Sequence, residues 1–307
     1  MLNPRQIESF HTKGYLVLHD VLTDKLPAVI AEYETVLDHL CAAWGVRGVD
    51  FEDKIIRAYM QGNEWFQPLD ISLPGDRIFA NTPMHQGPAV FDMITAPALL
   101  DIVEALIGPE ITSNPIQHVR IKPPAPTLME EENRAHITRT DWHQDRAVAL
   151  EEADNTDMVT VWIAVTDATE ENGCLQVIPF DGPPKMLPHC PKTQTAIADG
   201  YIDDADAVPL PVKAGGVVLL HPLIAHSSLI NQTKGIRWSF DLRFNKTGQP
   251  TGRPHFPDFV ARSKADPASE LHDWRAWREM WETARERLSV SPHIAIHRWT
   301  SDAPNCA

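Results

Sequence analysis

The sequence lacks the features that mark membrane-spanning and secreted proteins. It contains no run of eighteen apolar residues, and its N-terminus has no basic segment followed by an apolar core. We therefore expect neither a transmembrane helix nor a signal peptide, and we expect a cytoplasmic location. Cysteine is scarce, with four residues scattered along the chain: Cys41, Cys174, Cys190 and Cys306. Because their spacing fits neither a zinc knuckle nor a disulfide framework, we expect reduced thiols.

Positive charge is also scarce. Lysine and arginine number 27 against 42 aspartates and glutamates, which gives a formal net charge of -15 at pH 7. Nucleic acids and anionic membranes attract basic surfaces, so neither is an expected partner. The expected partner is a small-molecule substrate, and an anionic one would have to be held by local arginines.

A Gly/Ser-rich linker is absent, and 43% of the residues are apolar. This composition can bury one large core, so residues 1–307 are expected to form a single domain. Residues 1–110 are expected to be mainly helical support. Their first helix is predicted to begin at Pro4, after the cap Asn3, and to end at Gly14. A strand at 15–18 and helices at 25–44 and 96–107 are expected to follow.

Residues 111–250 are expected to form the core. Short candidate strands separated by Gly, Pro, Asn and Asp lie at 117–122, 141–147, 158–165, 174–178, 208–212, 217–221 and 236–245. So many strands with turn signals predict a closed or double-sheet β architecture. The segments 124–140 and 181–206 are expected to be long loops that act as lids or select the substrate. Residues 251–307 are expected to form a helix and tail that pack on the core, because tryptophans recur there at helical spacing.

The stretch Asp141-Trp142-His143-Gln144-Asp145 places a histidine and a carboxylate two residues apart in an expected strand. Side chains at i and i+2 project from the same face of a strand, so both can reach one metal ion. His226, after the apolar run 216–220, could supply a third ligand; His221 ends the same run and competes for this role. Two imidazoles and one carboxylate with open positions suit non-haem Fe(II).

The segment from Ile236 to Phe244 alternates strictly between apolar and polar residues. Its apolar face is expected to pack under helices or a second sheet, and its polar face to line solvent or a cavity. The polar face carries Arg237, Asp241 and Arg243. Two arginines and an aspartate facing a cavity would indicate an anionic ligand.

The order of these residues, His143-x-Asp145, His226 and Arg237, resembles the phytanoyl-CoA dioxygenase family of Fe(II)- and 2-oxoglutarate-dependent oxygenases. The resemblance extends to Trp162 and to the Asn-Gly-Cys-Leu stretch that begins at Asn172. It covers residues 117–246 well and the N-terminal hundred residues more loosely. The chain departs from the family at 179–182, where Pro-Phe-Asp-Gly replaces the usual Pro-Gly-Ser-His.

The resemblance implies a mainly β fold with flanking α-helices, built on a double-stranded β-helix, also called a jelly roll or cupin-like core. It further implies that His143, Asp145 and His226 are the metal ligands and the catalytic residues. In the family, an arginine eleven residues after the second histidine holds the distal carboxylate of 2-oxoglutarate. Arg237 occupies that position here.

Three further residues are expected near the co-substrate by the same resemblance: Ser228, Trp162 and His118. The implied reaction uses 2-oxoglutarate and O₂ as co-substrates and releases succinate and CO₂. Its expected outcome is hydroxylation of an unactivated C–H bond in a small organic acid, natural product or acyl derivative. Related halogenases lack the carboxylate ligand, so the presence of Asp145 favours hydroxylation. No basic cluster suited to a coenzyme A phosphate is present, since Arg120 and Lys122 form only a sparse pair.

Two alternatives belong to other functional classes. The chain could be a different metal-dependent enzyme on the same barrel, such as a zinc hydrolase, or a cofactor-free dioxygenase; Arg237 would then have no assigned role. It could instead be a non-catalytic member that binds a carboxylate ligand. The complete ligand set argues against the second alternative, because a degenerate site should have lost at least one ligand.

Overall fold

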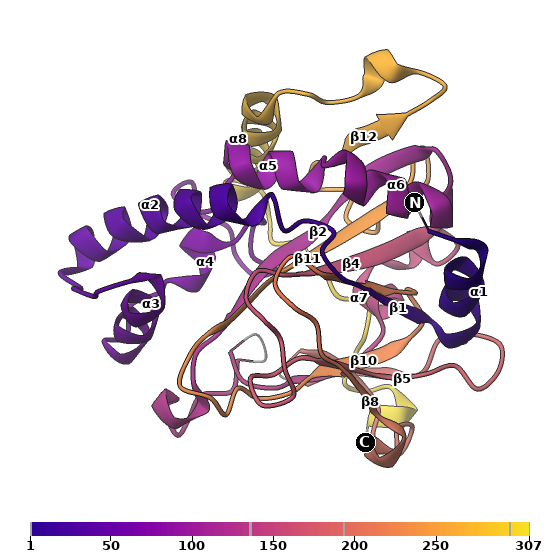
Figure 1. Cartoon of the computed structure of the whole chain (residues 1–307), viewed down its shortest axis with the longest axis horizontal. Helices are drawn as coiled ribbons and strands as arrows, with labels where there is room; N and C mark the ends of the chain where they lie inside the picture. The colour runs from indigo at the N-terminus through magenta and orange to yellow at the C-terminus, as the bar shows by residue number, and fades with distance from the viewer. Residues whose placement is uncertain (1, 135–136, 193, 295, 307) are drawn as a thin grey trace.

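Figure 1 presents the computed structural model of the chain, which describes residues 2–134, 137–192, 194–294 and 296–306. The N-terminal part is mainly helical. It contains α1 (Pro4–Lys13), β1 (Tyr15–Leu18), α2 (Leu26–Trp44), α3 (Phe51–Met60), α4 (Phe66–Leu69), α5 (Pro88–Ile94) and α6 (Pro97–Ile107). The predicted limits of α1 are confirmed, because Asn3 caps the helix and Gly14 ends it with a φ of 85°. Such a left-handed conformation favours glycine.

The rest of the chain forms antiparallel sheets. A six-stranded sheet has the order β1-β9-β4-β11-β2-β12, and a four-stranded sheet has the order β3-β10-β5-β8. The strands of the first sheet after β1 are β2 (Glu110–Lys122), β4 (Met158–Ala164), β9 (Val217–Leu220), β11 (Arg237–Lys246) and β12 (Phe259–Ser263). Those of the second are β3 (Thr140–His143), β5 (Leu175–Ile178), β8 (Val208–Leu210) and β10 (Ala225–Ser228). The chain is thus mainly β with added helices, as predicted.

Several smaller elements complete the structure. A two-stranded hairpin joins β6 (His189–Pro191) to β7 (Thr195–Ile197), and the later helices are α7 (Asp145–Val148) and α8 (Trp274–Ser289). Short 3₁₀ turns lie at Ala125–Thr127, Glu151–Ala153, Asp204–Asp206, Pro267–Ser269 and Pro304–Cys306. The expected loop 181–206 is therefore partly wrong, because the hairpin lies within it. None of the helices in the described ranges is long and apolar enough to cross a membrane.

The main core lies between the six-stranded sheet and the helices, which cover the sheet in Figure 1. The apolar face of β11 is buried there, as its alternation predicted. Trp238 stacks on Phe51 of α3 with ring centroids 4.7 Å apart, and Tyr33 of α2 contacts both Trp238 and Phe240. The helix α8 also packs back as expected, with Trp277 and Trp281 in the same core. The opposite face of the sheet is thereby left for polar residues.

The edges of the six-stranded sheet come from the two ends of the chain. β1 pairs with β9 at one edge, and β12 pairs with β2 at the other. The expected core limits at residues 110 and 250 are therefore not limits of the sheet. Both flanking segments contribute one strand to it.

The expectation of four reduced cysteines is wrong. Cys190 and Cys306 form a disulfide with their Cα atoms 5.5 Å apart, whereas Cys41 and Cys174 are free and buried. The partners are separated by 116 residues, so no spacing pattern could indicate the bond, and only the folded chain brings the tail to β6. Because disulfides are rare in reducing compartments, this bond is unusual for a protein expected in the cytoplasm.

Candidate metal centre

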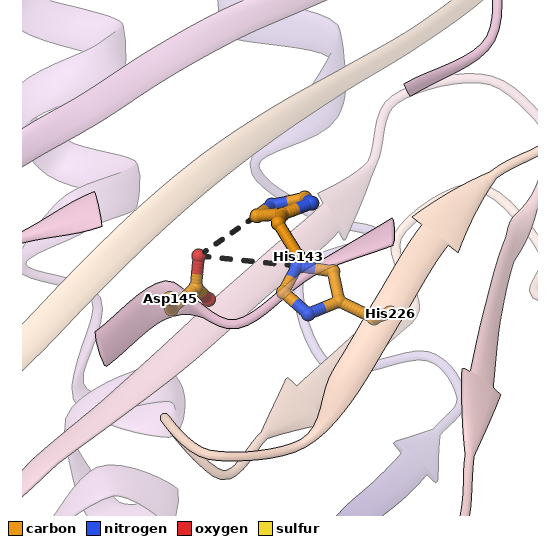
Figure 2. Close-up of side chains that lie close together, drawn as sticks. All are labelled: His143, Asp145 and His226. Carbon is orange, nitrogen blue, oxygen red and sulfur yellow. Dashed lines mark ion pairs between the residues drawn. The ribbon is translucent and has the colours of Figure 1, made fainter. Parts of the chain in front are cut away.

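The three predicted ligands converge on one another, as Figure 2 shows. His143 ends β3 and pairs in register with His226 of the neighbouring strand β10. The Nε2 atoms of His143 and His226 lie 3.9 and 3.8 Å from Oδ1 of Asp145. One ligand atom from each residue lies within 4.8 Å of the others. This spacing allows one ion to contact all three residues.

The predicted reason for this convergence needs a correction. The expected strand 141–147 ends at His143, and Asp145 is the first residue of the short helix α7. Gln144 between them is extended, with φ of -120° and ψ of 134°. The histidine and carboxylate therefore meet across a strand-to-helix junction, and not as i and i+2 residues of one strand.

Backbone carbonyls orient both imidazoles. Nδ1 of His143 lies 2.8 Å from the Asp141 carbonyl, and Nδ1 of His226 lies 3.2 Å from the Ile224 carbonyl. Because a carbonyl only accepts, each Nδ1 carries the proton and each Nε2 offers a lone pair. Burial, together with the neighbouring His226, lowers the pKa of His143 to about 3. The imidazole of His143 is therefore neutral at physiological pH, as a metal ligand must be.

Asp145 is almost completely buried, with 1% of its surface exposed, and both of its oxygens accept hydrogen bonds. Thr160 of β4 donates to Oδ2, and Arg243 of β11 donates to Oδ1, the oxygen that faces the imidazoles. Burial alone would raise the pKa of Asp145, but Arg243 and the two histidines outweigh it, so the pKa lies below its ordinary value. The carboxylate is therefore ionised.

A cavity of about 500 Å³ adjoins this centre. Residues of β2, β4 and β11 line it from one sheet, and residues of β3, β5 and β10 line it from the other. The four predicted co-substrate residues all line it: His118, Trp162, Ser228 and Arg237. His221, the competing ligand candidate, lies elsewhere and contacts Phe10 and Phe180.

Arg237 lines this cavity and makes no ion pair with an acidic residue in the described part of the chain. It is 2% exposed, it donates to Ser239 Oγ at 2.6 Å, and its guanidinium lies 5.3 Å from the centre of the Trp162 ring. Burial lowers the pKa of Arg237 to about 10. Its Nε is buried and has no hydrogen-bond partner among the described residues. A ligand carboxylate could accept from this unused donor.

Ser228 accepts a hydrogen bond from Lys122, a residue for which the sequence predicted no role at the site. Lys122 Nζ donates to Ser228 Oγ at 2.8 Å and to the Leu229 carbonyl at 2.7 Å, and Ser228 Oγ donates to Thr140 Oγ1. Burial, followed by the charge of Arg237, lowers the pKa of Lys122 well below its ordinary value. Lys122 and Arg237 pair in register across β2 and β11. Two basic side chains therefore lie next to each other on this wall of the cavity.

Two further polar residues at the site were not predicted. Asp70 accepts from His118 Nδ1 at 2.8 Å and from the Val119 N–H, so it fixes the ring of His118. His189, which was expected to lie in a loop, is on β6, and its Nε2 accepts from the N–H of Gln144 beside the metal ligands. Neither contact follows a sequence period, because each joins residues more than forty positions apart.

Comparison with known proteins identifies relatives. A family model described as "Phytanoyl-CoA dioxygenase (PhyH)" matches residues 10–239. The "Probable phytanoyl-CoA dioxygenase" of Caenorhabditis elegans is 29% identical over 160 residues. That alignment covers 49% of this chain and 48% of the nematode protein. The chain thus spans about half the length of this relative.

Solved structures share the fold. The apo form of the non-heme monooxygenase ThoJ matches with a TM-score of 0.62 and 21% identity, over 92% of this chain and 97% of that chain. The epimerase SnoN, in complex with Fe³⁺, alpha ketoglutarate and nogalamycin RO, matches with a TM-score of 0.54 and 18% identity. This second match covers 81% of this chain and 86% of SnoN. At such identities the likeness establishes a common fold.

Proposed function

The chain belongs to the phytanoyl-CoA dioxygenase family, and from that membership we propose that it is an Fe(II)- and 2-oxoglutarate-dependent dioxygenase. One observation carries the proposal: two imidazole nitrogens and an ionised carboxylate oxygen converge beside a cavity that Arg237 lines. The antiparallel sheets that enclose the cavity are, in this proposal, the two halves of a double-stranded β-helix.

The donor set suits Fe(II). His143 and His226 offer nitrogen lone pairs, Asp145 offers an anionic oxygen, and three ligands leave positions open for co-substrates. When bound, iron would supply the activation of O₂ that couples decarboxylation of 2-oxoglutarate to oxidation of the substrate. The role of the chain is to hold the three ligands in place, Asp145 through Thr160 and Arg243 and the two histidines through backbone carbonyls.

We propose that Arg237 holds the distal carboxylate of 2-oxoglutarate. A planar guanidinium can bind a carboxylate through two parallel hydrogen bonds, which a lysine cannot do. The Trp162 ring lies beside the guanidinium, and Ser228, bonded to Lys122, supplies polar contacts from the facing sheet. His118 suits this ligand less well, because its Nδ1–H is directed at Asp70 and its neutral ring would present an acceptor to the cavity.

We propose hydroxylation of a C–H bond in a small organic acid, natural product or acyl derivative as the outcome. The presence of Asp145 favours hydroxylation, since a halide would need the position that this carboxylate takes. The fold alone does not decide the outcome, because the similar structures include both a monooxygenase and an epimerase.

Anaerobic titration of the protein with Fe(II) and 2-oxoglutarate tests the proposal. We expect a weak visible charge-transfer band from iron chelated by 2-oxoglutarate, and no such band in a variant that combines His143→Ala and His226→Ala. In air, the wild type should release succinate from 2-oxoglutarate. A zinc hydrolase or a cofactor-free dioxygenase on the same barrel would give neither the band nor succinate, and that result would reject the proposal.

A further inference from the structure

One wall of the cavity carries a ladder of charged side chains. On β2, His118, Arg120 and Lys122 occupy alternate positions. On the neighbouring strand β11, Arg237 and Asp241 lie four positions apart on the same face, and all five residues line the cavity. The register pairs Lys122 with Arg237 and His118 with Asp241. Arg120 therefore lies opposite Ser239, between these two rows, and is a diagonal neighbour of both Asp241 and Arg237, at a Cα separation of roughly 7 to 8 Å for such a pair.

The cationic groups of the cavity differ in whether the protein supplies an acceptor. Arg243 is bonded to Asp145, and Lys122 to Ser228. Four cationic side chains donate to acceptors of the protein: Lys122, Arg237, Arg243 and Arg253. The guanidinium of Arg120, in contrast, makes no hydrogen bond or ion pair with any residue that the structure describes. Its contact is with the Phe66 ring, 5.7 Å away.

Asp241 carries a negative charge that, like the positive charge of Arg120, faces the cavity. Its carboxylate makes no hydrogen bond or ion pair within the described ranges, although it lies on the same wall as Arg120. Burial lowers the pKa of Arg120, and the carboxylates of Asp70 and Asp241 oppose that shift through space. Two opposite charges thus face one cavity within electrostatic range but unpaired. Partly desolvated charges of this kind are costly unless a ligand compensates them.

Arg120 is a diagonal neighbour of Arg237 across β2 and β11, but its guanidinium has a different aromatic contact. The guanidinium of Arg237 lies over Trp162 of β4, whereas that of Arg120 lies over Phe66 of α4. β4 and β2 flank β11 on opposite sides in the sheet order. The two guanidinium groups therefore lie over different rings on different elements, so one short dicarboxylate is not required to contact both.

We propose that the substrate is a small zwitterion of the α-amino acid type, whose carboxylate binds Arg120 and whose amino group binds Asp241. This inference rests on the proposed function and specifies its substrate class. A simple anion at Arg120 would be repelled by Asp241, and a simple cation at Asp241 would be repelled by Arg120. A zwitterion compensates both charges. His118 adds an acceptor for an N–H, because its own Nδ1–H is taken by Asp70.

Calorimetric titration of the protein with individual proteinogenic L-α-amino acids tests this site. The titrations are made without oxygen, on the protein loaded with Fe(II) and 2-oxoglutarate and on the protein alone. Each amino acid is compared with its N-acetyl form, which keeps only the negative charge, and its amide, which keeps only the positive charge. We expect at least one amino acid to bind, and both derivatives to bind about tenfold more weakly or worse.

Substitutions assign that binding to the two residues. Arg120→Met and Asp241→Asn should each weaken it by about tenfold or more and leave the affinity for 2-oxoglutarate nearly unchanged. Arg278→Met, on the exposed face of α8 where Arg278 pairs with Glu282, is the matched control and should bind like the wild type. The charge-transfer band of the iron complex verifies that each variant keeps its fold.

Three results would overturn the zwitterion site. They are the absence of binding by every amino acid, equal binding of the singly charged derivatives, and a loss of 2-oxoglutarate affinity in Arg120→Met. The last result would make Arg120 a co-substrate ligand. The proposed function fails separately, through absence of the charge-transfer band in the wild type. Amino acid binding that depends on Arg120 and Asp241 would support the site even in that case.

Discussion

Asp145 is restrained on both oxygens by residues from two different strands, Thr160 and Arg243. A carboxylate bonded in this way cannot rotate freely, so its metal-facing oxygen keeps one direction. Partners of metal ligands commonly determine metal affinity as strongly as ligand geometry does. Thr160 is the simpler partner to test, because its replacement leaves the charge of the site unchanged.

Thr160→Val removes one hydroxyl donor and keeps the shape of the side chain. We expect Fe(II) affinity to fall by about tenfold or more, because Oδ2 of Asp145 loses its partner and the carboxylate gains freedom. Equilibrium titration with Fe(II) under anaerobic conditions measures the effect. Thr35→Val on the exposed face of α2 is the control, and equal affinities in both variants would contradict the prediction.

Arg237→Met tests the co-substrate anchor. We expect the 2-oxoglutarate concentration at half-saturation to rise by about 30-fold or more, which corresponds to about 2 kcal/mol for a charge-assisted contact. Fe(II) affinity should stay within a few-fold of the wild type, because Arg237 contacts no metal ligand. An unchanged 2-oxoglutarate concentration at half-saturation would show that another cationic residue of the cavity holds the distal carboxylate.

The residues of the metal centre were predictable because their types are restricted by chemistry. Two histidines, an aspartate and a following arginine in family order identified His143, Asp145, His226 and Arg237, which the structure brings to one cavity. Asp70 could not be identified in this way. Its importance arises from a contact with His118 across 48 positions, and an aspartate in that place carries no local signal.

At the scale of elements, β11 shows how a strict period positions a site. Apolar side chains at alternate positions pack one face of β11 against the helices. The intervening polar residues therefore point to the opposite face, where the cavity lies. The apolar and polar faces were predicted because the alternation extends over nine residues, from Ile236 to Phe244. The strands β6, β7 and β10 have only three or four residues, too few for a period to be recognised.

Phe240→Ala should measure how much the packing of β11 against the helices contributes to the free energy of unfolding. Phe240 is fully buried and packs edge-on against Tyr33 with ring centroids 5.7 Å apart. We expect a loss of about 3 to 5 kcal/mol in the free energy of unfolding, followed by urea denaturation. Phe79→Ala is the control, since Phe79 is 53% exposed, and its effect should be within about 0.5 kcal/mol. Similar losses in both variants would contradict this account of β11.

At the scale of the whole molecule, the disulfide joins the C-terminal tail to the hairpin beside the cavity. Ile296 and His297 of that tail line the cavity, and Trp299 stacks on His189 at 5.2 Å. Thiol titration of the denatured, unreduced protein should detect two thiols, those of Cys41 and Cys174. Four thiols in protein isolated under oxidising conditions would show that the bond does not form.

Cys306→Ser should lower the free energy of unfolding by about 2 to 5 kcal/mol, because it releases a long closed loop in the unfolded chain. Chemical denaturation without reductant measures this loss. Cys41→Ser is the matched control for replacement of a thiol, and its effect should not change when reductant is added. The difference between wild type and Cys306→Ser should disappear in reductant.

Stability should also depend on pH through buried histidines. Burial lowers the pKa of His189 and of His221 to about 4 in the folded protein. The unfolded chain, with a pKa near 6.5, binds more protons below that pH. The neutral, buried histidines therefore make their full contribution to the free energy of unfolding above about pH 6.5. This contribution is lost as the pH falls toward 4, by about 2 kcal/mol for the buried His189.

Urea denaturation of the metal-free protein between pH 7.5 and 4.5 measures this dependence. His221→Asn, which keeps an acceptor for the Leu223 N–H, should flatten the curve. His39→Asn on the exposed face of α2 should leave it unchanged. A curve as steep in His221→Asn as in the wild type would assign the dependence to other groups.

The edge strands of the six-stranded sheet have a consequence for the order of folding. Tyr15 of β1 pairs with Leu220 of β9, 205 positions later, and Glu110 of β2 pairs with Ser263 of β12. Strand pairs between residues so far apart in the sequence form slowly, because a long stretch of chain must first be confined. During synthesis β1 remains unpaired until the ribosome has made most of the chain, including its partner strand β9. A nascent chain of this protein therefore exposes strand edges for an extended time, and unpaired edges of this kind are where chains aggregate.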